Sequence, residues 1–238
     1  MPGATRSRAE AVPHDGHAGF SARQNAVLET ALQLLVSRGE SGLTTSGIAR
    51  AARCSKESLY KWFGDREGLL AALVAYQAGK VRIIDETAAP RTRAEFRRAL
   101  VMFAEDLAGV LLGDVSLALN RLAIAGAARE GSSLGRALNE HGKKRIENRA
   151  KALLMAGRRL GHIRFDDPEE AYQTLYGLII GDTHIRRLLG DGEAPDAAAL
   201  AARAETAVLT FERLYSRTAE DITQPRAIVQ AGADRAST

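Results

Sequence analysis

The sequence predicts an all-α protein with a small N-terminal and a larger C-terminal helical domain, and three observations support this prediction. The chain of 238 residues is rich in Ala, Leu, Arg and Glu. It contains no run in which polar residues alternate with β-branched or aromatic ones, which is the pattern typical of strands. Its six prolines lie far apart, and the long stretches between them suit helices.

Capping signals place the N-terminal helices. Ser21 and Gln24 have the spacing of a capping box at the start of a first helix, and Gly39 is expected to end that helix. Two shorter helices follow. A fourth helix is expected from Asp65 to Glu86, which would make it roughly 30 Å long at 1.5 Å per residue.

Similar signals place the C-terminal helices. Thr92 begins a second capping box, and Asp167 with Pro168 starts a helix that is expected to continue to Gly190. Asp196 starts the last helix. These boundaries predict about nine helices in total.

The chain is expected to divide into four parts. A disordered leader covers residues 1–20, a first domain 21–87, a second domain 91–217, and a flexible tail 218–238. The two ends are assigned in this way because they contain proline and glycine and show no helical period.

Composition excludes several classes of protein. Hydrophobic residues make up 45% and charged residues 26%, which is typical of a globular chain and not of a disordered one. The single cysteine excludes a disulfide framework or a multi-cysteine zinc site, and it fits a reducing compartment. No apolar run approaches the length of a membrane span, and the N-terminus is unlike a signal peptide. We therefore expect a cytoplasmic protein without membrane association.

The segment from Leu43 to Leu70 has the pattern of a helix-turn-helix. Thr44 can cap one short helix, Arg53 and Cys54 form a tight turn, and Ser55 can cap a second short helix that ends at residue 63. The second helix places two apolar residues on one face and polar residues on the others. A helix of this kind fits the major groove of DNA.

The charge of this segment supports a nucleic-acid partner. The whole chain has a net charge of +4 and a pI of about 9.4, which permits an anionic partner without requiring one. Between Thr44 and Arg66, however, five basic residues oppose two acidic ones, so most of the net charge lies where phosphates would be. The basic residues are Arg50, Arg53, Lys56, Lys61 and Arg66, and the acidic ones are Glu57 and Asp65.

The same segment resembles the DNA-binding domain of TetR-type transcriptional regulators. Ten positions agree with the family pattern in type and spacing: Thr44, Ile48, Ala49, Ser55, Leu59, Tyr60, Phe63, Arg66, Glu67 and Leu69. The C-terminal part is similar to AcrR/AefR-like members through three short runs over residues 119–129, 132–138 and 161–171. The chain departs from the pattern in the turn. Arg53 replaces the usual glycine and would have to adopt a positive φ at some cost, and Cys54 replaces a common valine.

The resemblance implies a repressor that a small organic molecule releases from a palindromic operator. Thr44 and Tyr60 would bind phosphates, Arg66 would meet phosphate from the start of the fourth helix, and the second short helix would face bases or the adjacent backbone. The expected DNA-binding residues are Thr44, Thr45, Ser55, Lys56, Glu57, Ser58, Tyr60, Lys61, Trp62 and Arg66.

The second domain is expected to bind the effector and to form the homodimer. Candidate ligand-binding residues combine aromatic side chains with polar anchors: Phe103, Asn120, Arg121, His141, Tyr172, Tyr176 and His184. Arg121 has a second interpretation as a structural ion-pair partner. The expected dimer contacts come from the last two helices, where Gly177 and Gly181 are spaced to share one helix face: Gly177, Ile180, Gly181, Phe211 and Leu214. The alternative is that this glycine pair packs within one subunit.

Other groups of reactive or charged residues are accounted for by structure and do not indicate a further chemical activity. Cys54 beside two basic residues has the surroundings of a redox sensor, but its place between two short helices is typical of a packed side chain. The histidines lack metal-ligand spacing, so we expect no metal and no cofactor. The acids at 166, 167, 169 and 170 are accounted for by a helix start and do not indicate catalysis. Two rival functions stay open: an architectural DNA-binding protein without a ligand, and a helical enzyme that retains a DNA-binding head.

Overall fold

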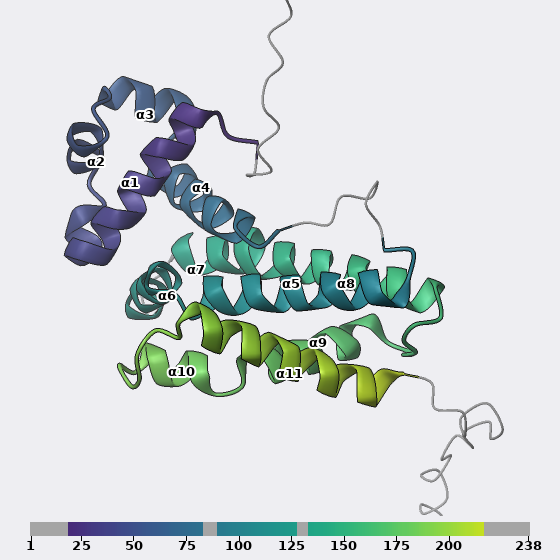
Figure 1. The fold of residues 1–238 in the computed structure, drawn as a ribbon. Coiled ribbons are helices and arrows are strands. Elements are labelled where there is room, and N and C mark those ends of the chain that lie inside the picture. The colour runs from purple at the N-terminus through teal and green to yellow at the C-terminus, as the bar shows by residue number, and fades with distance from the viewer. Residues whose placement is uncertain (1–18, 83–89, 128–132, 217–238) are drawn as a thin grey trace, which may run out of the picture. The chain divides into compact units, whose positions relative to one another are not determined.

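The structure is a computed structural model that describes residues 19–82, 90–127 and 133–216 (Figure 1). Within these ranges every regular element is a helix, so the all-α prediction is confirmed. The expected leader, apart from its last two residues, and the expected tail lie outside the described residues.

The described residues form a series of α-helices with two short turns of other helical types. In order they are α1 (Ala22–Arg38), a 3₁₀ turn (Gly39–Gly42), α2 (Thr45–Ala51), α3 (Lys56–Phe63), α4 (Arg66–Gly79), α5 (Arg93–Leu111), α6 (Asp114–Gly126), α7 (Ser133–Ala137), a π-helical turn (Leu138–Lys143), α8 (Lys144–Arg159), α9 (Pro168–Ile180), α10 (Thr183–Leu188) and α11 (Ala197–Tyr215).

The predicted caps are present. Ser21 and Gln24 exchange the two hydrogen bonds of a capping box at α1, and Gly39 ends that helix with φ of 63°. The hydroxyl of Thr92 accepts from the Glu95 backbone, and the Glu95 carboxylate accepts from the Thr92 backbone, before α5. Local capping signals are therefore sufficient to place these helix ends, because each depends on residues three positions apart.

Two expected helices are shorter than predicted. α4 ends at Gly79, where the backbone amides of Lys80 and Val81 turn back to carbonyls three residues earlier, so the helix is about 21 Å long instead of about 30 Å. The helix expected from 168 to 190 is interrupted at Gly181, whose φ of 53° lies in the left-handed region and ends α9. α10 is thus a separate helix.

The described residues pack into two compact units. Of the described residues, the first unit contains 19–82, 109–127, 133–146 and 184–194, and the second contains 90–108, 147–183 and 195–216. Compact units need not coincide with domains, so the expected domain boundary at 87–91 stays a prediction.

The first unit has one continuous apolar core. Val27, Leu28 and Ile48 of the N-terminal helices share it with Leu119 and Leu134, which lie on α6 and α7. α1 packs on α6, and α4 packs on α7 and on the π-helical turn, where a Cβ on Gly142 would meet Val74 at 3.2 Å. The N-terminal helices are thereby joined to part of the C-terminal sequence through buried apolar contacts.

The second unit is built around two packed helices, α9 and α11. Arg203 of α11 donates hydrogen bonds to the carbonyl oxygens of Ile179 and Ile180 at the end of α9, at 3.0 and 3.3 Å, and to the Thr183 hydroxyl at 2.8 Å. A guanidinium therefore satisfies carbonyls that the end of a helix leaves without partners.

Candidate nucleic-acid interface

Helix α3 has a buried apolar face and an exposed polar one. Leu59 and Phe63 are buried in the core of the first unit, with 3% and 8% of their surface exposed. Four polar residues of the same helix are exposed, namely Lys56, Glu57, Tyr60 and Lys61. The tyrosine stands out because 55% of this large ring remains exposed. Such a face is what a recognition helix needs in order to reach groove atoms and phosphates.

The ends of α2 and α3 are fixed by side-chain caps. The Thr44 hydroxyl accepts from the Gly47 amide at 3.1 Å, and the Ser55 hydroxyl accepts from the Ser58 amide at 3.0 Å. The Ser55 and Ser58 hydroxyls also lie 3.1 Å apart. These groups orient both helices before any partner arrives.

The turn between α2 and α3 has a positive φ at Arg53, as the sequence predicts. Its value is 51°, and no other non-glycine among the described residues has a positive φ. The Cys54 amide donates to the Ala49 carbonyl at 2.9 Å and the Arg53 amide donates to the Arg50 carbonyl at 3.3 Å, which is the hydrogen-bond pattern of a Schellman motif.

One residue that supports this turn is not predicted by the sequence. Arg23 of α1 donates from Nη2 to the carbonyl oxygens of Ala52 and Arg53, at 2.9 and 2.8 Å. The residues are about 30 positions apart, and no local spacing rule connects them.

The remaining expected DNA-binding residues differ in accessibility. Thr45 and Ser58 are half-buried. Trp62 is also half-buried and packs on the core, with its ring centroid 6.2 Å from that of Phe63 in an edge-to-face arrangement. Only part of the indole is therefore open to a partner.

Arg66 lies at the start of α4, beside the Asp65 side chain that caps this helix. Its guanidinium pairs with Glu40 at 3.3 Å and reaches the Leu43 carbonyl at 3.5 Å. Both charged side chains are more than half exposed, so the pair is weak and a phosphate can compete for the guanidinium.

The charge on α3 is set partly by its own N-terminus. A hydrogen bond from its backbone amide, followed by one from the Ser55 hydroxyl, lowers the pKa of Glu57. Glu57 is therefore ionised at neutral pH, and the positive charge of the exposed face comes from Lys56 and Lys61.

Comparison with known proteins agrees with this geometry. The family model "Bacterial regulatory proteins, tetR family" matches residues 27–73, and the model "AefR-like transcriptional repressor, C-terminal domain" matches residues 98–217. A TetR transcriptional regulator from Agrobacterium tumefaciens is 57% identical, with a TM-score of 0.70 over 82% of this chain and 95% of the other.

The chain belongs to the TetR family.

Two further TetR-family structures are similar at lower identity. A regulator from Mesorhizobium loti is 25% identical, with a TM-score of 0.64 over 82% of this chain and 97% of the other. A protein named flavonoid-responsive regulator FrrA is also 25% identical, with a TM-score of 0.57 over 86% and 98% of the two chains. No curated protein matches the chain. TetR-family proteins are DNA-binding regulators and not enzymes.

The candidate effector residues of this TetR-family chain divide between the two units. Four lie in the first unit. His141 is exposed, and the Asn120 amide donates to the Ser116 carbonyl of its own helix at 2.8 Å. Arg121 donates to the carbonyls of Arg187 and Leu188 at 2.6 and 3.1 Å, which supports its structural interpretation, although the bonds are to backbone and not to an acid.

His184 has an open hydrogen-bonding atom. Its Nε2 is buried and has no hydrogen-bond partner among the described residues. Burial lowers the pKa of this histidine, so the imidazole is neutral at neutral pH. A buried polar atom without a partner is unusual and is compatible with a bound molecule or water.

The other three candidates, Phe103, Tyr172 and Tyr176, belong to the second unit. Phe103 and Tyr172 are buried, whereas Tyr176 is half-buried. The centroids of the two tyrosine rings are 6.0 Å apart. Burial raises the pKa of both hydroxyls, which therefore remain protonated donors.

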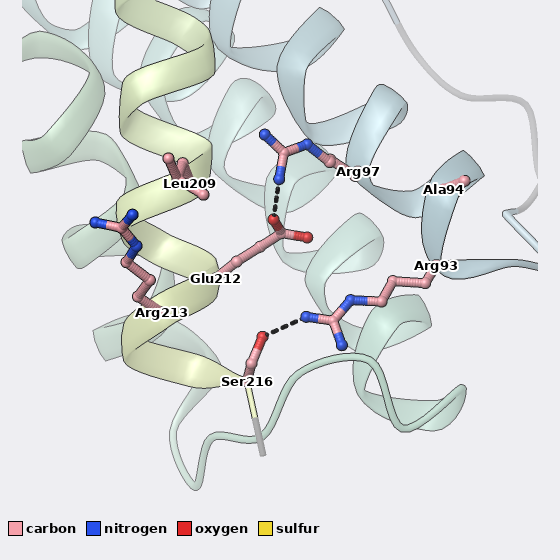
Figure 2. Close-up of a pocket in the computed structure, with 7 residues that line it drawn as sticks. All are labelled: Arg93, Ala94, Arg97, Leu209, Glu212, Arg213 and Ser216. Carbon is pink, nitrogen blue, oxygen red and sulfur yellow. Dashed lines mark hydrogen bonds and ion pairs between the residues drawn. The ribbon is translucent and has the colours of Figure 1, made fainter. Parts of the chain in front are cut away.

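A groove of about 840 Å³ lies between α5 and α11 in the second unit, and none of the candidate effector residues lines it (Figure 2). The Arg97 guanidinium is paired with Glu212 at 2.6 Å and Glu205 at 3.1 Å, and Arg93 donates to the Ser216 hydroxyl at 2.9 Å. The arginine–glutamate pairs in this groove indicate that its side chains hold α5 and α11 together.

The expected dimer contacts need correction. Ile180 and Phe211 are 2% and 0% exposed inside the chain's own core, so their side chains have no surface left for a partner. Gly181 does not share a helix face with Gly177, because it lies beyond the end of α9 in the left-handed region. Gly177 and Leu214 remain, since both are exposed.

No group of three or more His, Cys, Asp or Glu side chains among the described residues is placed to hold a metal ion. No single helix in that part is long and apolar enough to cross a membrane, and α5 with α6 meets the length and composition test only as a pair bent by 55°.

Proposed function

We propose that this TetR-family regulator is a homodimeric repressor that binds a palindromic operator through α3 and is released by a small organic molecule. The observation that carries the DNA-binding part is the exposed polar face of α3, held on a buried apolar face between two capped helix ends. Its Lys56, Tyr60 and Lys61 supply donors for phosphates and base edges. The site of action is the bacterial cytoplasm, where the DNA is.

Substitutions on this face test the proposal. Lys56→Ala and Tyr60→Phe are each expected to weaken binding by about 5- to 100-fold, because each removes a donor from the exposed face. If Lys56 contacts phosphate, Lys56→Ala should also lower the dependence of log affinity on log salt by about 1, whereas Tyr60→Phe removes no charge and should leave it unchanged. The measurement is titration of duplex DNA, selected by the full-length protein from a random library, at several salt concentrations.

Lys144→Ala is the matched control. This lysine is also exposed and cationic but lies on α8, where it pairs with Glu140. The affinity of the Lys144→Ala protein for the DNA should equal that of the wild-type protein. Unchanged affinity and salt dependence in both α3 variants would show that α3 is not the recognition helix.

The effector part of the proposal is supported by three features. His184 offers a buried atom without a partner among the described residues, Tyr172 and the half-buried Tyr176 offer an aromatic pair, and one relative is named as flavonoid-responsive. Within the second unit, the tyrosine pair would fit an aromatic small molecule with hydrogen-bonding groups, and within the first unit the His184 Nε2 would accept or donate one hydrogen bond. Within the first unit, contacts of α4 with α7 and the π-helical turn provide a route by which a change in the C-terminal sequence can reach the N-terminal helices.

Reciprocal binding tests this part. An aromatic molecule, found by thermal shift in a panel that includes flavonoids, should lower DNA affinity about 5- to 150-fold, and saturating DNA should lower the affinity for that molecule by the same factor. Tyr176→Ala should abolish the response without weakening DNA binding in the absence of the molecule. If no molecule of the panel releases the DNA while binding to palindromic and random DNA is equal, the architectural alternative is correct.

A further inference from the structure

We propose that Arg23 is a positioning residue for DNA recognition, which holds the turn between α2 and α3 closed without contacting DNA. This inference rests on the proposed function of α3. It adds a residue outside the helix-turn-helix that controls how α3 is presented.

The contacts of Arg23 are directed at the turn itself. One nitrogen, Nη2, donates to two consecutive carbonyl oxygens, those of Ala52 and Arg53. Both carbonyls follow α2, a helix of only seven residues, and the end of a helix leaves such oxygens without partners inside it. A cation at the negative end of a helix dipole is also favourable.

The position of Arg23 in its own helix does not explain why this residue is an arginine. The residue lies in the first turn of α1, where the helix dipole favours acidic side chains and disfavours basic ones. The unfavourable dipole of α1 is offset by the hydrogen bonds of Arg23 to the carbonyl oxygens after α2, about 30 residues away in the sequence.

The turn needs support because Arg53 has a positive φ. A residue with a Cβ is disfavoured in this conformation, whereas glycine is not. Arg23 binds the carbonyl of this same residue and the one before it. The guanidinium therefore stabilises the conformation that the Arg53 side chain destabilises, and the closed turn fixes the orientation of α3 relative to α2.

The single cysteine of the chain provides a direct measurement of turn opening. Cys54 follows Arg53, is half-buried, and its amide closes the turn through the Ala49 carbonyl. The rate at which its thiol reacts with an aromatic disulfide reagent should report transient opening. Arg23→Ala in the full-length protein is expected to raise this rate about tenfold, the factor that corresponds to 1.4 kcal/mol of lost hydrogen bonding.

DNA binding supplies the second measurement. Arg23→Ala is expected to reduce affinity for library-selected duplex DNA by about 3- to 10-fold, because part of the population presents α3 wrongly. The salt dependence should stay unchanged, since a positioning residue neutralises no phosphate. A salt dependence reduced by about 1, with unchanged thiol reactivity, would show that Arg23 is a phosphate contact and would overturn the proposal.

Two matched double variants test the role of Arg53. Arg53→Gly and Arg53→Ala both remove the same guanidinium, and only glycine removes the cost of the positive φ. In the Arg23→Ala background, the protein with Arg53→Gly should have a thiol reactivity about fivefold lower than the protein with Arg53→Ala. It should also bind DNA more tightly. Equal behaviour of the two double variants would overturn the proposal.

Failure of the proposed function has a different signature. If the wild-type protein selects no DNA sequence, the DNA-binding function fails, and the thiol measurements still decide whether Arg23 closes the turn. If DNA is bound and Arg23→Ala leaves both affinity and reactivity unchanged, the role of Arg23 alone is refuted.

Discussion

Gly177→Leu is expected to yield a monomer that binds operator DNA at least about 100-fold more weakly than the wild-type protein. Gly177 is an exposed residue of α9, and a Cβ built on it meets nothing within 4 Å in its own chain. Leucine should therefore leave the protomer intact. If α9 approaches a second copy closely at this point, as we propose, the added side chain prevents the approach.

Loss of the dimer should weaken DNA binding because two linked heads bind a palindrome cooperatively, whereas a single head binds one half-site. Sedimentation at micromolar concentration measures the change, from about twice the chain mass of 25.5 kDa to that mass itself. Gly181→Leu is unsuitable for this purpose, since a φ of 53° makes leucine strained there in any assembly.

Ala125→Leu provides the control for the added bulk. Ala125 is exposed on α6 and is not part of the proposed interface. This variant should remain a dimer with wild-type DNA affinity. A Gly177→Leu protein that sediments as a dimer, or a wild-type protein that is monomeric at the same concentration, would contradict the proposed interface.

Gly157→Ala is expected to lower the free energy of unfolding by about 1–3 kcal/mol, which for a chain of this size lowers Tm by about 2–12 °C. Gly157 is buried on α8, and a Cβ there would overlap three ring carbons of Phe96 on α5. Phe96 is fully buried, so the ring has no free space to move into. The usual gain from alanine in a helix, up to about 1 kcal/mol, is therefore reversed.

A compensating change distinguishes this clash from a general loss of stability. Phe96→Leu alone should destabilise the protein by leaving a cavity, whereas in the Gly157→Ala protein it makes room for the new methyl group. The double variant should be more stable than the sum of the two single effects predicts, in chemical denaturation at fixed protein concentration. Strict additivity would show that the two residues are not in contact.

Sequence patterns were sufficient for the features that depend on nearby residues. The caps at Ser21, Thr44 and Ser55 follow from residue type and from spacing over three positions. The positive φ at Arg53 was expected because the resembling family has glycine at this position. The apolar spacing of Leu59 and Phe63 likewise predicts which face of α3 is buried.

The errors at the expected dimer contacts arise where one sequence pattern fits two different structures. Ile180 and Phe211 were expected at a dimer interface, and both are buried in their own chain. Apolar residues on a helix show that one face will be covered, but periodicity does not say by what. The glycine at 181 likewise fits a helix face or a helix end, and the left-handed φ decides for the end.

The sequence alone determined an all-α TetR-family fold with a helix-turn-helix, because caps, turns and helical periods act through neighbouring residues. The tertiary structure decided which side chains bind the free carbonyl oxygens at the ends of distant helices. Arg23 binds those after α2, Arg121 binds those at the end of α10, and Arg203 binds those at the end of α9. A long, flexible arginine can reach many acceptors within its range. Only packing of the helices selects one of them, since the hydrogen bonds form when burial brings the two segments together.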